Sequence, residues 1–163
     1  MGTVKAESDK PVLMGTVLIE DTRNKADKHR NVAAYCEKHG IELVRQKLEV
    51  GDYALPAGSV AVDTKENLNE VATNLMNRSD ASRFWREVRR ARDMGVRLVI
   101  LVEHGGKIRT IHDVPKWKSQ YSPVTGRRLI DEMIRCEMAY GVEWQFCDKR
   151  STGKRIMEIL KED

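Results

Sequence analysis

Five consecutive apolar residues, Leu98 to Val102, constrain the fold of this chain more than any other feature of its sequence. A helix that crosses a membrane needs about 20 apolar residues, so this run is too short to form one. A run of this length is typical of a β-strand that is buried on both faces. The sequence therefore predicts a central strand over residues 96–103, inside a sheet that other elements cover.

The segments around this strand alternate between strand and helix patterns. Further strands are expected over residues 17–19, 41–47, 50–55, 60–65 and 142–147. Helices are expected over 29–38 and 127–140, and from three sites that favour helix starts, namely Asn67 (with Glu70 as its capping-box partner), Ser79 or Asp80, and Ser151 or Thr152. This order predicts an α/β fold with a mixed central β-sheet flanked by helices. Residues 104–125 show no clear pattern.

Length, charge and cysteine content restrict the class of protein. The 163 residues fit one domain, expected over residues 15–163, and residues 1–14 are expected to be a flexible tail. Three scattered cysteines without a C-x-x-C pair suit free thiols in a reducing compartment, the cytoplasm or the nucleoid. The N-terminus lacks the apolar core of a signal peptide, and no membrane partner is expected. The net charge of +4 permits a polyanionic partner without proving one.

Residues 50–65 carry the most informative charge pattern. When residues 56–59 form the loop of a hairpin, Leu55 pairs with Val60. Counting back along both strands then places Asp52 opposite Asp63. Directly opposed residues have Cβ atoms roughly 5 Å apart, so the two carboxylates could hold one cation.

Two interpretations of this face stay open. Opposed like charges are destabilising unless a cation offsets them, and Lys65 could do so as a plain salt bridge because alternate residues of a strand share a face. The other interpretation is a bound Mg²⁺ or Mn²⁺, since oxygen ligands select hard cations. Small residues on the same face, Ala54 and Ala61, would leave space for a ligand. Asp21, at the end of the first strand, could add a third carboxylate directly or through water.

The same residues resemble the PD-(D/E)XK nuclease superfamily, in which an aspartate is followed by an acid-any-lysine triplet on the next strand. Here these are Asp52 and Asp63-Thr64-Lys65. Further segments are similar to the XPF-type (excision-repair cross-complementing group four) nuclease domain: Ile19 to Arg23, Leu48 to Tyr53, Val62 to Lys65, Leu98 to Glu103 and Val142 to Leu160. The resemblance covers roughly residues 15–103 and 126–161. It implies a restriction-endonuclease-like core, a metal-dependent DNA endonuclease acting in repair, recombination or phage DNA processing, and a homodimer formed through C-terminal helices.

Three features depart from the family pattern. The triplet is usually Glu-Arg-Lys, whereas Asp63 keeps only the carboxylate and Thr64 removes a possible phosphate contact. Asn24 stands where the family often has a glutamate. The tandem helix-hairpin-helix module that usually follows is missing from these 163 residues. Branched or flap structures stay possible substrates of the endonuclease, while recognition through that module is left open.

The resemblance also implies a role for individual residues. Asp52 and Asp63, with the Thr64 carbonyl, would hold Mg²⁺ or Mn²⁺, which activates water for attack on a phosphodiester. Lys65 would orient that water or stabilise the developing negative charge. Asp21 would support the metal shell. Weaker candidates for a supporting role are Glu20, Arg23 and Glu70.

Other residues are candidates for contact with DNA. Four arginines on one predicted helix follow the site at spacings of three and four residues: Arg83, Arg86, Arg89 and Arg90. They either form a solvated face or follow phosphates, and beside a metal site we favour DNA for the group. Trp117 lies between Lys116 and Lys118, where packing is more typical than stacking on a base. Residues 151–155 lack the upstream glycine of a phosphate loop, so no nucleotide cofactor is expected.

Two other functions remain open at this point. The XPF-type family includes catalytically inactive DNA-binding or dimerisation subunits, which typically lose the acidic and lysine positions that this chain keeps. Such a subunit would bind no divalent ion. A nuclease for RNA or single strands is also compatible with the sequence, and a panel of labelled substrates would distinguish it.

Overall fold

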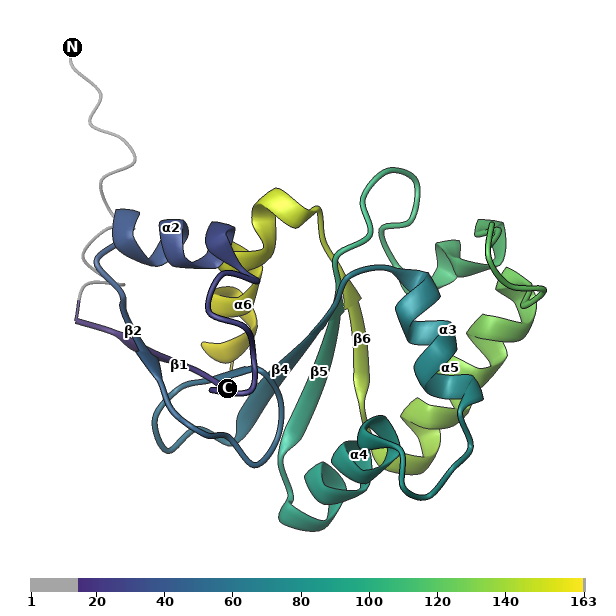
Figure 1. Cartoon of the computed structure of the whole chain (residues 1–163), viewed down its shortest axis with the longest axis horizontal. Coiled ribbons are helices and arrows are strands. Elements are labelled where there is room, and N and C mark those ends of the chain that lie inside the picture. Colours follow the sequence, from purple (N-terminus) through teal and green to yellow (C-terminus); the bar gives the residue numbers. More distant parts are fainter. Residues whose placement is uncertain (1–14, 163) are drawn as a thin grey trace.

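The structure, a computed structural model, describes residues 15–162, so the predicted tail over 1–14 lies outside the described residues. Six strands form one mixed sheet (Figure 1): β1 Val17–Glu20, β2 Glu42–Arg45, β3 Tyr53–Ala54, β4 Val60–Lys65, β5 Arg97–Val102 and β6 Glu143–Phe146. Their order across the sheet is β2-β1-β3-β4-β5-β6. The short strand β3 runs antiparallel to β1 and β4, and all other neighbours are parallel.

The apolar run lies on β5, between the parallel strands β4 and β6. All five of its residues are buried. Leu98, Ile100 and Val102 pack into one core cluster, whereas Val99 and Leu101 pack into the other. The prediction of a central strand that is apolar on both faces is therefore confirmed, because each face of the sheet is covered.

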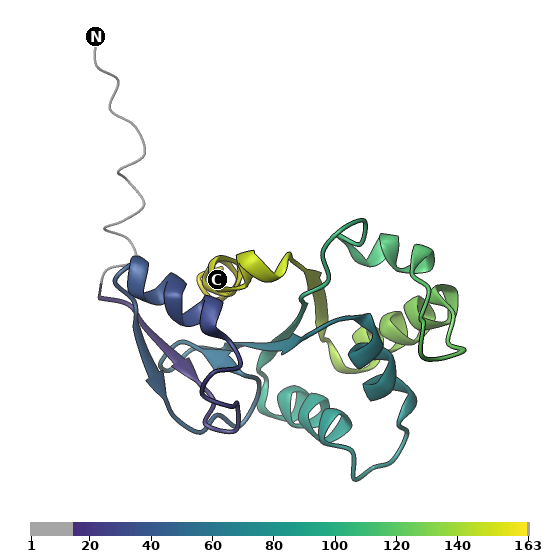
Figure 2. The same cartoon turned by 45° about the horizontal axis from the view of Figure 1, so that its top comes forward.

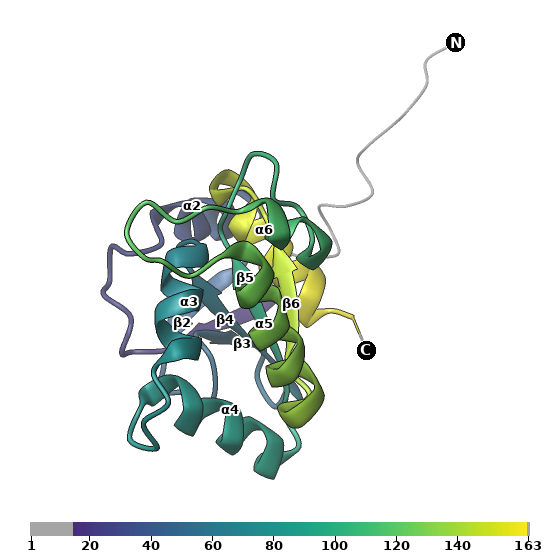
Figure 3. The same cartoon turned by 90° about the vertical axis from the view of Figure 1, so that its right-hand side faces the viewer.

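Five α-helices cover the two faces: α2 Arg30–Lys38, α3 Leu68–Met76, α4 Arg83–Met94, α5 Gly126–Tyr140 and α6 Thr152–Leu160. Figure 2 shows α2 and α6 side by side over one face. Figure 3 shows α3, α4 and α5 in front of the other face. The predicted α/β fold with a mixed sheet flanked by helices is thus confirmed.

One predicted helix start is wrong in position, and at another the predicted capping box forms only in part. Helix α4 begins at Arg83 and not directly after Ser79 or Asp80, because the Ser79 hydroxyl accepts from the Ala81 amide in a local turn, at 3.2 Å. At α3 the Asn67 side chain accepts from the Glu70 amide as predicted. The Glu70 carboxylate, however, accepts from the amide of Glu66 at 2.7 Å. Only half of the expected capping box forms.

The segment without a sequence pattern contains a 3₁₀ helix, η1 Ile111–Lys116, which packs against α5. A capping box begins it at Thr110. The packing against α5 is so close that a Cβ on Gly126 would lie 2.3 Å from the Val114 carbonyl oxygen, so only glycine fits there. Trp117 is buried in this packing, which leaves its ring unable to stack on a base.

Three further expectations concern the cysteines, the segment before the last helix, and membrane spans. The cysteines are all free thiols: Cys36 and Cys136 are buried and Cys147 is half-buried. A second 3₁₀ helix, η2 Lys149–Ser151, precedes α6, so the segment that partly resembles a phosphate loop is an ordinary helix start. Among residues 15–162, no helix is long and apolar enough to cross a membrane.

Candidate active site

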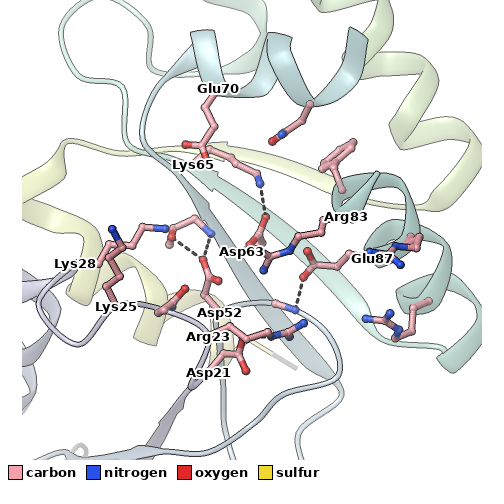
Figure 4. A pocket seen from close by; sticks show the side chains of 17 residues that line it. Asp21, Arg23, Lys25, Lys28, Asp52, Asp63, Lys65, Glu70, Arg83 and Glu87 are labelled. Carbon is pink, nitrogen blue, oxygen red and sulfur yellow. Dashed lines mark hydrogen bonds and ion pairs between the residues drawn. The ribbon is translucent and has the colours of Figure 1, made fainter. Parts of the chain in front are cut away.

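A cavity of about 660 Å³ opens where β1 and β4 end, between the loop after β1 and helices α3 and α4 (Figure 4). It brings together most of the residues that the sequence singles out. Those lining it are Asp21, Arg23, Asp52, Asp63, Thr64, Lys65, Glu70, Arg83, Arg86 and Arg90.

Asp63 and Lys65 form the centre of this site. Both lie on β4 and point to the face covered by α3 and α4, and the Lys65 Nζ is 3.0 Å from Asp63 Oδ2. Asp63 is only 6% exposed. Burial, together with the nearby Asp52 carboxylate, raises the pKa of Asp63 to about 7 although Lys65 opposes the rise. Burial alone would lower the pKa of Lys65, but Asp63 and two glutamates, Glu70 and Glu87, raise it overall, which keeps the amine charged.

The predicted hairpin register is confirmed. Tyr53 pairs with Val62 and Ala54 with Ala61, the register that was expected to bring Asp52 to Asp63. Strand β3 is shorter than expected, so Asp52 lies one residue before it, with its amide donating to the Val62 carbonyl. The expectation that both alanines border an open face is wrong, because Ala61 packs into the core under α3 and α4. Only the Asp63–Lys65 end of that face opens into the cavity.

Thr64 holds Asp52 in place from the neighbouring strand. Its amide and its hydroxyl both donate to Asp52 Oδ2, at 2.9 and 2.8 Å. The carbonyl of Lys65 accepts from the Glu103 amide on the β5 side. Since carbonyls of successive residues point to opposite sides of a strand, the Thr64 carbonyl points the other way, towards the Asp52 side of β4.

Glu87, on α4, is a residue of the site that the sequence interpretation missed. Its carboxylate accepts from the Gly51 amide at 2.5 Å and lines the cavity (Figure 4). Burial and the charge of Asp63 raise the pKa of Glu87 to about 7. The sequence could have indicated Glu87 through its spacing: it lies four residues after Arg83 and three before Arg90, which places all three on one face of the helix.

Asp21 and Arg23 line the cavity as a pair. Arg23 Nε lies 2.6 Å from Asp21 Oδ2, and the other Asp21 oxygen accepts from the Leu48 amide at 2.9 Å. The hydrogen bond to Asp21 raises the pKa of Arg23. Both Asp21 oxygens thus have protein partners, which suits a supporting role better than direct contact with an ion.

Two of the predicted residues lie outside the cavity. Glu20 is buried on β1, where its oxygens contact Arg45 Nη1 at 2.5 Å and the Tyr53 hydroxyl at 2.6 Å. Arg89 points to the other side of α4 and donates to the Asp80 carbonyl at 3.0 Å. It lines a separate cavity of about 310 Å³ between α4 and α5.

The walls of the main cavity are basic. Arg83, Arg86 and Arg90 approach from α4, and Lys25 and Lys28 approach from the loop opposite. The floor carries carboxylates while the walls carry cations. This arrangement favours a phosphodiester at the walls and a cation at the floor.

The floor suits a divalent ion that keeps several water ligands better than an ion whose ligands all come from the protein. Among the described residues, no group of three or more His, Cys, Asp or Glu side chains is already assembled around a common point. Two carboxyls of the floor, those of buried Asp63 and half-buried Glu87, nevertheless have a pKa raised to about 7, because of desolvation and because each lies near another negative charge. A divalent cation would relieve that repulsion, and Mg²⁺ typically needs only one or two protein carboxylates beside its waters.

A model of the ERCC4 domain matches residues 21–159, most of this chain. The chain belongs to the ERCC4 family, the XPF-type nuclease domains. XPF from Aeropyrum pernix has the same fold as this ERCC4 domain: the TM-score is 0.65 at 20% identity, over 89% of this chain and 63% of the other. The structure of XPF from Aeropyrum pernix in complex with DNA gives a TM-score of 0.64 at 20% identity, over 90% of this chain and 64% of the other. This ERCC4 domain therefore spans somewhat less than two thirds of those chains. No curated protein matches it.

Proposed function

We propose that this ERCC4 domain is a Mg²⁺- or Mn²⁺-dependent endonuclease that hydrolyses DNA phosphodiester bonds, with repair, recombination or phage DNA processing as its setting. The observation that carries the proposal is the convergence of Asp52, Asp63 and Glu87 beside Lys65 in a cavity with basic walls. Family membership supports the same chemistry.

The residues proposed to hold the ion are Asp52, Asp63 and the carbonyl of Thr64, with Asp21 in support. When bound, a divalent ion supplies Lewis-acid chemistry, polarising a phosphoryl oxygen and lowering the pKa of water. Asp63 must be ionised to bind it, and the pKa of about 7 makes ion binding compete with a proton.

Lys65 is proposed to act on the reacting phosphate. Its charged amine, held 3.0 Å from Asp63, can donate to the attacking water or to the oxygen on which charge develops. Arg83 and Arg86, which line one wall of the cavity, are proposed to hold neighbouring phosphates and so fix the strand over Asp63.

Two partners are part of the proposal. The first is DNA, with which XPF from Aeropyrum pernix has been crystallised. The second is another copy of the chain, bound through the C-terminal helices. Of these, α6 buries its apolar face inside the domain, whereas α5 leaves Met138 81% exposed and Ile134 39% exposed. A dimer would therefore use α5.

Plasmid nicking tests the proposal directly. The chain should nick supercoiled DNA with Mg²⁺ or Mn²⁺ and not with EDTA, and Asp63→Asn should lower the rate at least about a hundredfold. Asp93→Asn, an exposed aspartate on α4, is the matched control and should cut like the parent. If Asp63→Asn cuts as fast as the parent, the assignment is wrong.

The same samples distinguish the catalytically inactive alternative. An inactive subunit should bind DNA, release no nicked product and show no binding of Mn²⁺ in a calorimetric titration. Labelled duplex, flap, fork, single-stranded and RNA substrates then give the preferred nucleic acid.

A further inference from the structure

A chain of buried polar side chains lies behind the site, on the face of the sheet opposite Asp63. Its centre is His29, 8% exposed, the residue directly before α2. The imidazole Nδ1 is 2.8 Å from the Tyr53 hydroxyl, and Nε2 is 3.3 Å from the Thr64 hydroxyl. His29 therefore connects two strands that carry or adjoin residues of the active site.

The direction of these hydrogen bonds follows from the other partners of the two hydroxyls. Tyr53 donates to Glu20 Oε2 at 2.6 Å, and Thr64 donates to Asp52 Oδ2 at 2.8 Å. Each hydroxyl hydrogen is used on a carboxylate, so towards the imidazole each hydroxyl oxygen can only accept. A neutral imidazole has one N–H, and both contacts are hydrogen bonds only when both ring nitrogens carry a proton. With a hydrogen on Nε2, His29 donates to the Thr64 hydroxyl and fixes the rotamer in which Thr64 donates to Asp52.

This row of polar side chains is anchored in the fold at both of its ends, which are Glu20 and Glu103. The Glu20 carboxylate is held by Arg45 at 2.5 Å. On the other side, His29 Nε2 lies 3.7 Å from Glu103 Oε1, and Glu103 Oε2 accepts from the Thr152 hydroxyl at the start of α6, at 2.6 Å. Burial would raise the pKa of Glu103, but His29 and Thr152 bring it below its ordinary value, so Glu103 is ionised beside the imidazole.

We propose that His29 is a positioning residue of the active site. It acts through the Thr64 hydroxyl, which binds Asp52 Oδ2 and so fixes the orientation of this carboxylate at the wall of the cavity. The inference rests on the proposed function, because it concerns the orientation of a carboxylate that would hold the metal. Partners that orient metal ligands in this way typically contribute about 10- to 100-fold to metal affinity.

The test measures Mn²⁺ binding to the whole chain by electron paramagnetic resonance, independently of cleavage. His29→Leu and Thr64→Val should each weaken Mn²⁺ binding about tenfold. Thr64→Ser, which keeps the hydroxyl, should restore the parent affinity. The matched control is His39→Leu, since His39 lies at the other end of α2 with its ring against Tyr35 and should bind Mn²⁺ like the parent.

A double variant separates positioning from general loosening of the fold. If His29 acts through Thr64, the double variant His29→Leu/Thr64→Val should bind Mn²⁺ no more weakly than Thr64→Val alone. Additive losses, or parent-like binding by folded Thr64→Val, would overturn the inference. Should His29→Leu fail to fold, parent-like Mn²⁺ binding by Thr64→Val would still overturn the inference. A parent chain that binds no Mn²⁺ would instead refute the proposed function, and the inference with it.

Discussion

At the end of β4, the two faces of the sheet differ in how completely their carboxylates are paired. On the face under α3 and α4, Asp63 pairs with Lys65 and Glu87 accepts from the Gly51 amide, yet both carboxyls have a pKa raised to about 7. On the face under α2 and α6, Glu20 and Glu103 each have at least two partners of their own. We call these the open face and the closed face.

The difference separates function from stability. Buried charges that are fully paired stabilise one arrangement of the surrounding elements, as on the closed face. The open face keeps an excess of negative charge next to a cavity, which lowers stability unless a cation enters. Substitutions on the open face should therefore change both chemistry and the pH dependence of stability. Substitutions on the closed face should mainly lower stability, with His29 as the exception because it contacts Thr64.

The largest expected effect is loss of cleavage on the open face. Lys65→Met removes the amine that is proposed to stabilise developing charge, and we expect the single-turnover rate to fall about 10²- to 10³-fold. DNA affinity should change only slightly, because other cations form the walls. Lys154→Met, at an exposed position of α6, serves as the control. A Lys65→Met variant that keeps a tenth of the rate would remove Lys65 from the mechanism.

The pH dependence of folding should be the next largest effect. Asp63 and Glu87 have raised pKa values, so the folded state binds more protons than the unfolded state between about pH 4 and 7. The free energy of unfolding should then fall as pH rises through that range. Counting only one pH unit of each shift, as a lower bound, gives a fall of about 3 kcal/mol in total.

Urea unfolding at pH 5 and pH 8 in EDTA measures this change. The double variant Asp63→Asn/Glu87→Gln should flatten the dependence, and Mg²⁺ should restore stability to the parent at pH 8. Equal stability of the parent at both values would contradict an excess of buried negative charge on the open face.

On the closed face, Tyr53→Phe should lower the free energy of unfolding by about 1–3 kcal/mol. The change removes a buried hydroxyl and leaves Glu20 Oε2 and His29 Nδ1 without that partner. Tyr121→Phe is the matched control, because Tyr121 is 82% exposed. A loss no greater than in the control would mean that the closed face contributes little.

The smallest effect concerns the basic wall. Arg83→Glu or Arg86→Glu should weaken DNA binding about tenfold and lower the slope of affinity against salt by about one for each phosphate that is no longer bound. Arg89→Glu should weaken it less, since Arg89 faces the other cavity. Fluorescence anisotropy over a range of salt concentrations measures both, and an equal loss in all three variants would restore the four-arginine surface expected from sequence.

The strand pattern predicted the sheet and the centre of the site well. Alternation along residues 60–65 and a four-residue loop were enough to place Asp52, Asp63 and Lys65, because strand register depends on local spacing. Glu87 and His29 were missed because their roles depend on how α4 and α2 pack on the sheet. The helical spacing of Arg89 could not show which side of α4 it faces.

The loop from Thr22 to Lys28 is held near both of its ends. Asp21 binds Arg23 at its start, Arg45 binds the Asn24 carbonyl, and His29 anchors its end. A ligand that enters the cavity thus meets Lys25 and Lys28 on a pre-organised backbone, and binding need not order that segment. The binding free energy of such a ligand is therefore not reduced by the entropy cost of ordering a flexible loop.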